Sequence, residues 1–148
     1  MEEYIIVNGS EKHIEALELL EKQCFSLPWT REQLITQLPD ERHIFLVTEY
    51  GGNAVAYVGM MYVLDEGYIS NVAVSPQHRK KGLADALINR IVEISHEKEL
   101  AFITLEVRRS NIPAISLYEK HGFVKVGIRK NYYDLPKEDA ILMTKFLK

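Results

Sequence analysis

Residues 71–84 read NVAVSPQHRKKGLA, which is the end of an apolar strand, a turn, a basic run and the start of a helix. The first turn of a helix presents backbone N–H groups without intrahelical partners, together with the positive end of the helix dipole. Gly82 and Ala84 have small side chains or none, so an anion can approach this backbone closely. The basic residues 79–81 add positive charge at the same point. The pattern therefore favours a phosphate or pyrophosphate site over a solvated basic helix start.

The segments around this stretch predict an antiparallel meander followed by a βαβ unit. Strand-like runs precede it at 43–50, 54–64 and 67–74, and their short connections include the turn Gly51-Gly52-Asn53. Apolar residues at helical spacing over 83–97 predict an amphipathic helix, and 102–107 is a buried type of strand. The two strands that flank this helix should run parallel.

The remaining segments extend this sheet and cover it with helices. Ser10, Thr30 and Asn111 can each cap a helix, and His121-Gly122 ends the third of these. Strands are expected at 4–7, 123–128 and 140–146. The predicted order β-α-α-β-β-β-α-β-α-β-β gives an α/β fold with a mixed, mostly antiparallel sheet, a central parallel βαβ unit and flanking helices.

Composition limits the possible functions. The 148 residues are expected to form one domain over 1–148. A net charge of −3 disfavours a protein that binds duplex nucleic acid by neutralising its phosphates. Cys24 is the only cysteine, which suits a reducing compartment, and it is expected to be a small core residue. The histidines show no metal-ligand spacing, so no metal is expected. The N-terminus lacks the basic start of a signal peptide, and no apolar run is long enough to span a membrane.

The pattern Arg79-x-x-Gly82-x-Ala84 after a strand ending Asn71-Val72-Ala73-Val74 resembles the acyl-CoA-binding signature of the GNAT superfamily of N-acetyltransferases. The predicted order of elements is similar to the fold of that superfamily. Further segments resemble its RimI-type branch, the bacterial ribosomal-protein-alanine N-acetyltransferases; they include Pro28-Trp29-Thr30, Leu105-Glu106-Val107-Arg108, Leu117-Tyr118-Glu119 and Asn131-Tyr132-Tyr133. The similarity runs along nearly the whole chain.

The resemblance implies that acetyl-CoA binds between two strands, 68–74 and 102–107, which diverge from one another. The pantetheine arm would bond the backbone of the first strand, and the pyrophosphate would be held at the helix start. Asn111 would contact the cofactor as well as cap its helix. The implied cofactor-binding residues are Val72, Ala73, Val74, Arg79, Lys80, Lys81, Gly82, Leu83, Ala84, Asn111 and Tyr118.

Glu106 and Tyr118 are the candidate catalytic residues. A carboxylate on an apolar strand is costly unless it is paired or useful, and an ion pair with Arg108 is the simple structural explanation for Glu106. The resemblance implies instead that Glu106 is the general base that deprotonates the attacking amine. A tyrosine on a helix usually packs, but the resemblance implies that Tyr118 is the general acid for the departing thiolate.

The implied activity is transfer of acetyl to a protein N-terminal α-amine, by direct attack in a ternary complex, and most directly to the N-terminal alanine of a small-subunit ribosomal protein in the cytoplasm. Trp29, Tyr132 and Tyr133 could line the approach of the acceptor peptide, although ordinary packing explains each of them nearly as well. Two alternatives stay open: a lysine or small-amine acetyltransferase on the same fold, and a non-catalytic acyl-CoA sensor. No membrane partner and no direct nucleic-acid partner are expected.

Overall fold

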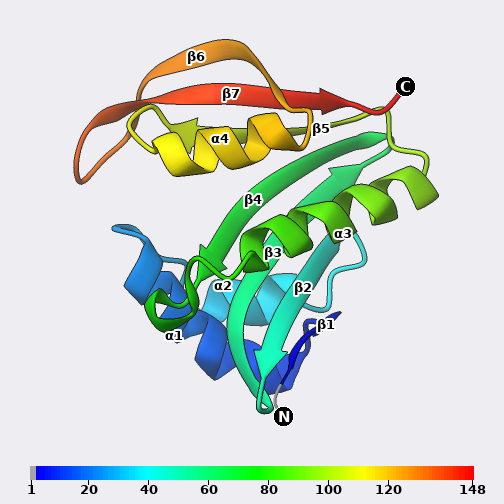
Figure 1. Cartoon of the computed structure of the whole chain (residues 1–148), viewed down its shortest axis with the longest axis vertical. Coiled ribbons are helices and arrows are strands. Elements are labelled where there is room, and N and C mark those ends of the chain that lie inside the picture. The colour runs from blue at the N-terminus through cyan, green and yellow to red at the C-terminus, as the bar shows by residue number, and fades with distance from the viewer. Residues whose placement is uncertain (1–2) are drawn as a thin grey trace.

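The computed structural model describes residues 3–148, and the alternating strands and helices form one seven-stranded sheet with helices on both faces (Figure 1). The sheet order is β1-β2-β3-β4-β5-β7-β6. The strands are β1 (Tyr4–Asn8), β2 (His43–Tyr50), β3 (Asn53–Val63), β4 (Glu66–Val74), β5 (Phe102–Arg108), β6 (Val124–Tyr133) and β7 (Glu138–Phe146). The helices are α1 (Ile14–Cys24), α2 (Arg31–Gln37), α3 (Leu83–Glu97) and α4 (Ile112–Lys120), with short 3₁₀ turns η1 (Glu11–His13) and η2 (Pro76–His78).

The sheet opens between its fourth and fifth strands. β4 and β5 are its one parallel pair, and they pair only from Glu66 opposite Phe102 to Tyr68 opposite Thr104. Beyond that point β4 stays paired with β3 and β5 stays paired with β7, but not with each other. The two halves of the sheet therefore diverge, as Figure 1 shows, and the divergence that the resemblance implied is confirmed.

Two apolar cores cover the two faces of the sheet. The period-two alternation of β3 divides its side chains between them: Val58 and Met60 face α3, whereas Tyr57 faces α1 and α2. Leu87 and Ile91 of α3 are fully buried in the first core. Burial of one such side chain contributes about 1.5–3 kcal/mol. These cores hold the strands on either side of the opening in place.

The predicted order of strands and helices is confirmed, and the differences lie at the ends of elements. Ser10 caps the 3₁₀ turn η1 rather than α1 itself. The predicted strand 123–128 begins at Val124 and continues to Tyr133. The hydrophobic pattern does not mark this extension, because β6 is an edge strand whose residues are almost all exposed. Its register with β7 is also irregular between Arg129 and Tyr133.

Candidate active site

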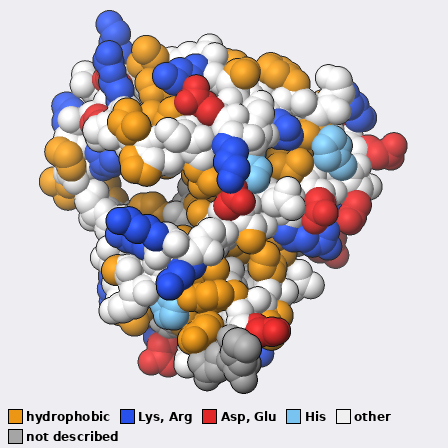
Figure 2. All heavy atoms as spheres, in the orientation of Figure 1, with side chains coloured by type: hydrophobic (Ala, Val, Ile, Leu, Met, Phe, Trp, Pro, Cys, Tyr) orange, Lys and Arg blue, Asp and Glu red, His pale blue; other side chains and the backbone are white. Residues whose placement is uncertain are grey.

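The backbone of β4 supplies free hydrogen-bonding groups to the opening. Positions along an antiparallel pair alternate between hydrogen-bonded and non-hydrogen-bonded. Ser75 N donates to Val55 O at 2.8 Å, so by this alternation the N–H and C=O groups of Val72 and Val74 point away from β3. The groups of Val72 and the N–H of Val74 face the space where β5 no longer pairs with β4, whereas Val74 O accepts a hydrogen bond from Arg79 Nε. The space-filling view shows a hollow between the two halves of the molecule (Figure 2).

The start of α3 forms an anion cradle beside this opening. Gly82 is the N-cap residue with φ 77° and ψ 18°, and no side chain caps the helix. The amides that follow Gly82 are therefore available to a ligand, and a Cβ at Gly82 would meet nothing within 4 Å. Lys80 also has a positive φ, 63°. Left-handed conformations at Lys80 and Gly82 are typical of turns whose successive N–H groups bind an anion such as a pyrophosphate.

The three basic residues before Gly82 divide into two kinds. Arg79 Nε donates to Val74 O at 3.2 Å, and Arg79 Nη2 lies 3.7 Å from Cys24 Sγ. The Arg79 side chain therefore ties the turn to the end of β4 and to α1. Lys80 and Lys81 are exposed. Their charge is the part of this basic run that remains free for an anion.

An ion-pair cluster joins the start of α3 to the end of α4. Asp85 Oδ1 lies 3.1 Å from Lys120 Nζ and 2.8 Å from His121 Nε2. Hydrogen bonds from Lys120 first, and from His121 second, lower the pKa of Asp85. Lys120 and His121 offset the negative charge of Asp85, which would otherwise weaken anion binding at the start of α3. The cluster also links α4 to α3 across the opening.

Glu106 lies on β5, beyond the last residue that pairs with β4. Its side chain is 9% exposed, and Oε2 is buried with no hydrogen-bond partner among the described residues. The ion pair with Arg108 is wrong: Arg108 is bound elsewhere, and the cation near Glu106 is Arg129, whose Nε lies 3.8 Å from Oε1. Arg129 comes from β6, so sheet order rather than sequence spacing provides the partner.

Two tyrosines surround the Glu106 carboxylate. Interaction with this carboxylate, followed by burial, raises the pKa of Tyr132. Burial, followed by the charge of Glu106, raises the pKa of Tyr68. Both hydroxyls therefore stay protonated at neutral pH. Tyr68 was not among the sequence candidates; it stands at the end of the paired part of β4, which no pattern in the sequence marks.

The helix α4 carries both of its candidate residues. Asn111 is the N-cap residue, and its Oδ1 accepts a hydrogen bond from Ala114 N at 3.3 Å, which confirms the predicted cap. Tyr118 is 8% exposed and packs against Phe123 with ring centroids 5.8 Å apart. Burial alone raises the pKa of Tyr118 to about 12. This phenol is thus a weaker acid than a free tyrosine, and it stays protonated at any working pH.

The three candidate aromatic residues do not share one environment. The Trp29 ring packs edge-on against Phe45, 6.3 Å away, beside the core under α1 and α2. Tyr132 is 48% exposed next to Glu106, whereas the half-buried Tyr133 lies under the Arg108 guanidinium at 4.4 Å. Packing explains the Trp29 ring, and the two tyrosines border the carboxylate.

Glu21 is a buried acid that the sequence analysis did not single out. It is fully buried in α1, where it accepts hydrogen bonds from Trp29 N at 2.7 Å and Asn71 Nδ2 at 2.6 Å, and another from the Tyr57 hydroxyl. One carboxylate therefore joins α1, β3 and β4 to the segment after α1. A sequence signal existed: Glu21 lies four residues after Leu17, on the apolar face of the helix.

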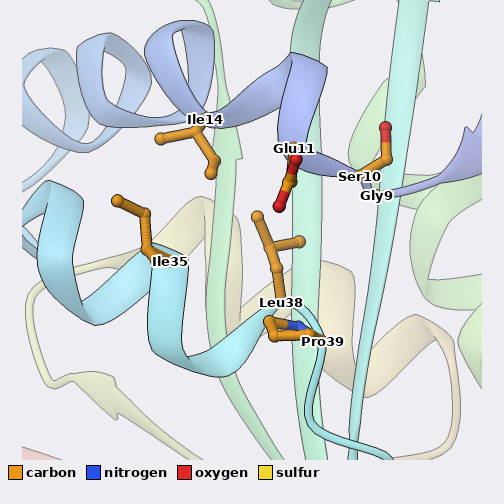
Figure 3. A pocket seen from close by; sticks show the side chains of 7 residues that line it. All are labelled: Gly9, Ser10, Glu11, Ile14, Ile35, Leu38 and Pro39. Atoms are coloured by element: carbon orange, nitrogen blue, oxygen red, sulfur yellow. The ribbon is translucent and has the colours of Figure 1, made fainter.

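Other surface features lie apart from this site. A cavity of about 440 Å³ between the start of α1 and α2 is lined by Gly9, Ser10, Glu11, Ile14, Ile35, Leu38 and Pro39, none of which is a candidate residue (Figure 3). Within residues 3–148, no group of His, Cys, Asp or Glu side chains is arranged to hold a metal ion. No helix in the same range has the length and apolar character needed to cross a membrane.

Comparison with known proteins identifies the family. Residues 14–123 match the model of the acetyltransferase (GNAT) family. A protein of Bacillus subtilis (strain 168) is 38% identical over 125 residues, covering 84% of this chain and 83% of its own. The ribosomal protein bS18-alanine N-acetyltransferase of Escherichia coli (strain K12) is 35% identical over 126 residues, covering 84% of each chain. The crystal structure of the E. coli ribosomal-protein-S18-alanine N-acetyltransferase superposes with a TM-score of 0.92 at 30% identity, covering 99% of this chain and 95% of that one. With a matching family model, relatives at this identity and the diverging β4–β5 pair, the chain belongs to the GNAT family of acetyltransferases.

Proposed function

We propose that this protein transfers the acetyl group of acetyl-CoA to the N-terminal α-amine of a protein, and that its acceptor is the N-terminal alanine of ribosomal protein bS18. The observation that carries the proposal is the buried, unpartnered Oε2 atom of Glu106 at the point where β4 and β5 diverge. A buried acceptor without a donor is costly, so a donor supplied by the substrate explains why it is kept. An ammonium group is such a donor.

The opening fits acetyl-CoA on three counts. The free backbone groups of Val72 and the N–H of Val74 can bond a pantetheine arm. The uncapped amides after Gly82 can hold a pyrophosphate, with Lys80 and Lys81 nearby. When bound, acetyl-CoA supplies a thioester whose carbonyl carbon is open to attack by an amine. The proposed cofactor contacts remain those predicted, except that the head group of Arg79 is engaged with Val74 O and helps through the shape of the turn.

Glu106 is proposed as the general base. Its carboxylate takes a proton from the α-ammonium, directly or through a water molecule, so that the neutral amine can attack. An α-amine has a pKa near roughly 8, against about 10.4 for lysine, so less work is needed to deprotonate it. Arg129 Nε lies 3.8 Å from Oε1 on one side of the carboxylate, while Oε2 is left for the substrate.

Tyr118 is proposed as the general acid. Its side chain extends from α4 into the apolar core that also contains the buried residues of α3. It stays protonated because burial raises its pKa to about 12. Because a thiol has a pKa near roughly 8.5, full transfer from free tyrosine to thiolate is uphill, and burial increases that cost. Tyr118 therefore donates a hydrogen bond to the sulfur as negative charge develops there, and its proton passes to the sulfur as the thiolate leaves, a cost that proximity offsets.

The acceptor assignment rests on the relatives and on the tyrosines beside Glu106. The E. coli relatives at 35% and 30% identity are named as bS18-alanine N-acetyltransferases. Tyr132 and Tyr133 present protonated hydroxyls and ring faces along the edge of the carboxylate site, where they can contact the first residues of an extended peptide. A ribosomal protein tail is met in the cytoplasm, which we propose as the site of action.

The test uses two peptides and mass-spectrometric mapping after incubation with acetyl-CoA. One peptide has the bS18 N-terminal sequence with a free α-amine; the other has that amine blocked and a lysine available. Acetyl on the α-amine alone supports the proposal, acetyl on lysine refutes it in favour of a lysine acetyltransferase, and acetyl-CoA binding without transfer indicates a sensor. Glu106→Gln and Tyr118→Phe should each lower kcat by roughly 10²–10⁴ if the roles are right.

A further inference from the structure

Arg108 is the last residue of β5, and its guanidinium group binds two segments of the chain that lie far apart in the sequence. Nη1 donates to Pro136 O at 2.9 Å and to Glu138 at 3.3 Å. Nη2 donates to Asp134 O at 2.9 Å and to Ser26 Oγ at 3.4 Å. The two halves of the planar guanidinium group therefore bind different partners at the same time.

The surroundings of Arg108 hold it in this orientation. Its guanidinium lies 4.4 Å from the centre of the Tyr133 ring. Glu138, its carboxylate partner, also accepts a hydrogen bond from Ser110 N at 2.6 Å. The Arg108 side chain is 24% exposed and that of Glu138 18%, so the pair is only partly screened by water.

The segments joined in this way are two loops. The α1–α2 loop, residues 25–30, contains Ser26, and the β6–β7 loop, residues 134–137, contains Asp134 and Pro136. Glu106 lies two residues before Arg108, on the same face of β5. The two loops therefore meet at a single side chain, two residues along β5 from the carboxylate that we propose as the base.

We propose that Arg108 is a positioning residue for the acceptor: it fixes the distance between the α1–α2 loop and the β6–β7 loop, and so sets the width of the approach to Glu106. This inference rests on the proposed transfer to a peptide amine. Arg108 touches neither the reacting amine nor the cofactor in this scheme. Its loss should weaken peptide binding more than it slows the chemical step.

Lysine cannot replace arginine in this role. An ammonium group carries the charge to Glu138, but it lacks the planar fork that reaches both loops and it stacks less well on Tyr133. Arg109 offers a matched control at the next position, because its side chain is 67% exposed and its ion pair is with Asp139 at 3.6 Å. Arg108→Lys keeps the charge but loses the planar fork, whereas Arg109→Gln loses a nearby charge and leaves the fork of Arg108 intact.

The experiment compares wild type with Arg108→Gln, Arg108→Lys and Arg109→Gln. Kinetics use acetyl-CoA and a short peptide with a free N-terminal alanine and no lysine. Hydrogen–deuterium exchange of residues 25–30 and 134–137 is measured in the same proteins without peptide. We expect Arg108→Gln to raise the peptide KM by about tenfold or more with kcat changed by less than about threefold, and to increase exchange in both loops. Arg108→Lys should recover less than half of the loss, and Arg109→Gln should match wild type.

Unchanged exchange in either loop of Arg108→Gln overturns the inference, as does a fall in kcat at unchanged KM. If Arg108→Gln does not fold, Ser26→Ala removes only the contact to the α1–α2 loop; it should raise exchange in residues 25–30 and raise the peptide KM, and no change in that exchange overturns the inference. Failure of the proposed function is distinguishable, because wild type would then leave the α-amine unmodified whatever the exchange data show.

Discussion

Replacing Glu21 by alanine tests whether one buried carboxylate holds α1, β3 and β4 together. The side chain is fully buried and accepts from Trp29 N, Asn71 Nδ2 and the Tyr57 hydroxyl. Glu21→Ala leaves the buried Tyr57 hydroxyl and the part-buried Trp29 N–H without this acceptor, limits the Asn71 amide to its 3.2 Å bond with the Tyr57 oxygen, and opens a cavity. At about 1–3 kcal/mol for each orphaned donor, less what relaxation and water entry recover, the free energy of unfolding should fall by about 3–6 kcal/mol.

Glu21→Gln provides the graded comparison. It keeps the shape and one carbonyl oxygen, and both Tyr57 and Asn71 can reverse their roles by turning the hydroxyl or the amide. It should therefore cost about 1–3 kcal/mol, at most half of the alanine effect. Because a domain has about 5–15 kcal/mol in total, the alanine variant approaches the limit of folding whereas the glutamine variant does not.

Urea unfolding at pH 7 measures both effects. Trp29 is the only tryptophan of the chain and belongs to the cluster, so its fluorescence reports the cluster while far-UV circular dichroism reports the whole fold. Glu15, an exposed acid of the same helix, is the control, and Glu15→Ala should change stability by less than about 0.5 kcal/mol. Equal costs for Glu21→Ala and Glu21→Gln, or an alanine cost below about 1 kcal/mol, would refute the reasoning.

Three further predictions address the anion cradle, pH dependence and a helix cap. Gly82→Ala and Gly52→Ala should each cost about 1–2 kcal/mol of stability, because both residues have a positive φ, although an added Cβ would meet nothing within 4 Å. Only Gly82→Ala should raise the Kd of acetyl-CoA, measured by calorimetry. The pKa of Asp85 is lowered from its ordinary 3.8. The carboxylate therefore contributes its full stabilisation above pH 3.8, and this contribution is lost as pH falls through the folded-state pKa. Urea midpoints measured from pH 6 to 3 should fall less steeply in Asp85→Asn than in wild type. Thr30→Ala removes the acceptor of Gln33 N, so it should lower the free energy of unfolding by about 1 kcal/mol in the same urea assay, whereas an unchanged midpoint would mean that the cap contributes nothing.

The fold was predictable to a large extent because its signals are local. Caps such as Thr30 and Asn111 act on residues three positions away, and both are formed as predicted. The extension of β6 to Tyr133 was missed because an exposed edge strand has no need of an apolar face. Pairing between β6 and β7 creates that extension, and such pairing leaves little trace in the sequence of one strand.

In the candidate site too, local features could be predicted from the sequence, whereas contacts between residues distant in the sequence could not. The strand, basic turn and helix start at 71–84 could be predicted from local sequence, because backbone amides at a helix start need only local structure to face an anion. The partners of the charged groups depend instead on how the strands assemble: Arg129 rather than Arg108 lies beside Glu106, and Glu21 binds Asn71 from fifty residues away. The physical reason is that a buried charge is stabilised by whichever groups the sheet order brings within hydrogen-bond distance, and sheet order depends on the packing of the whole chain.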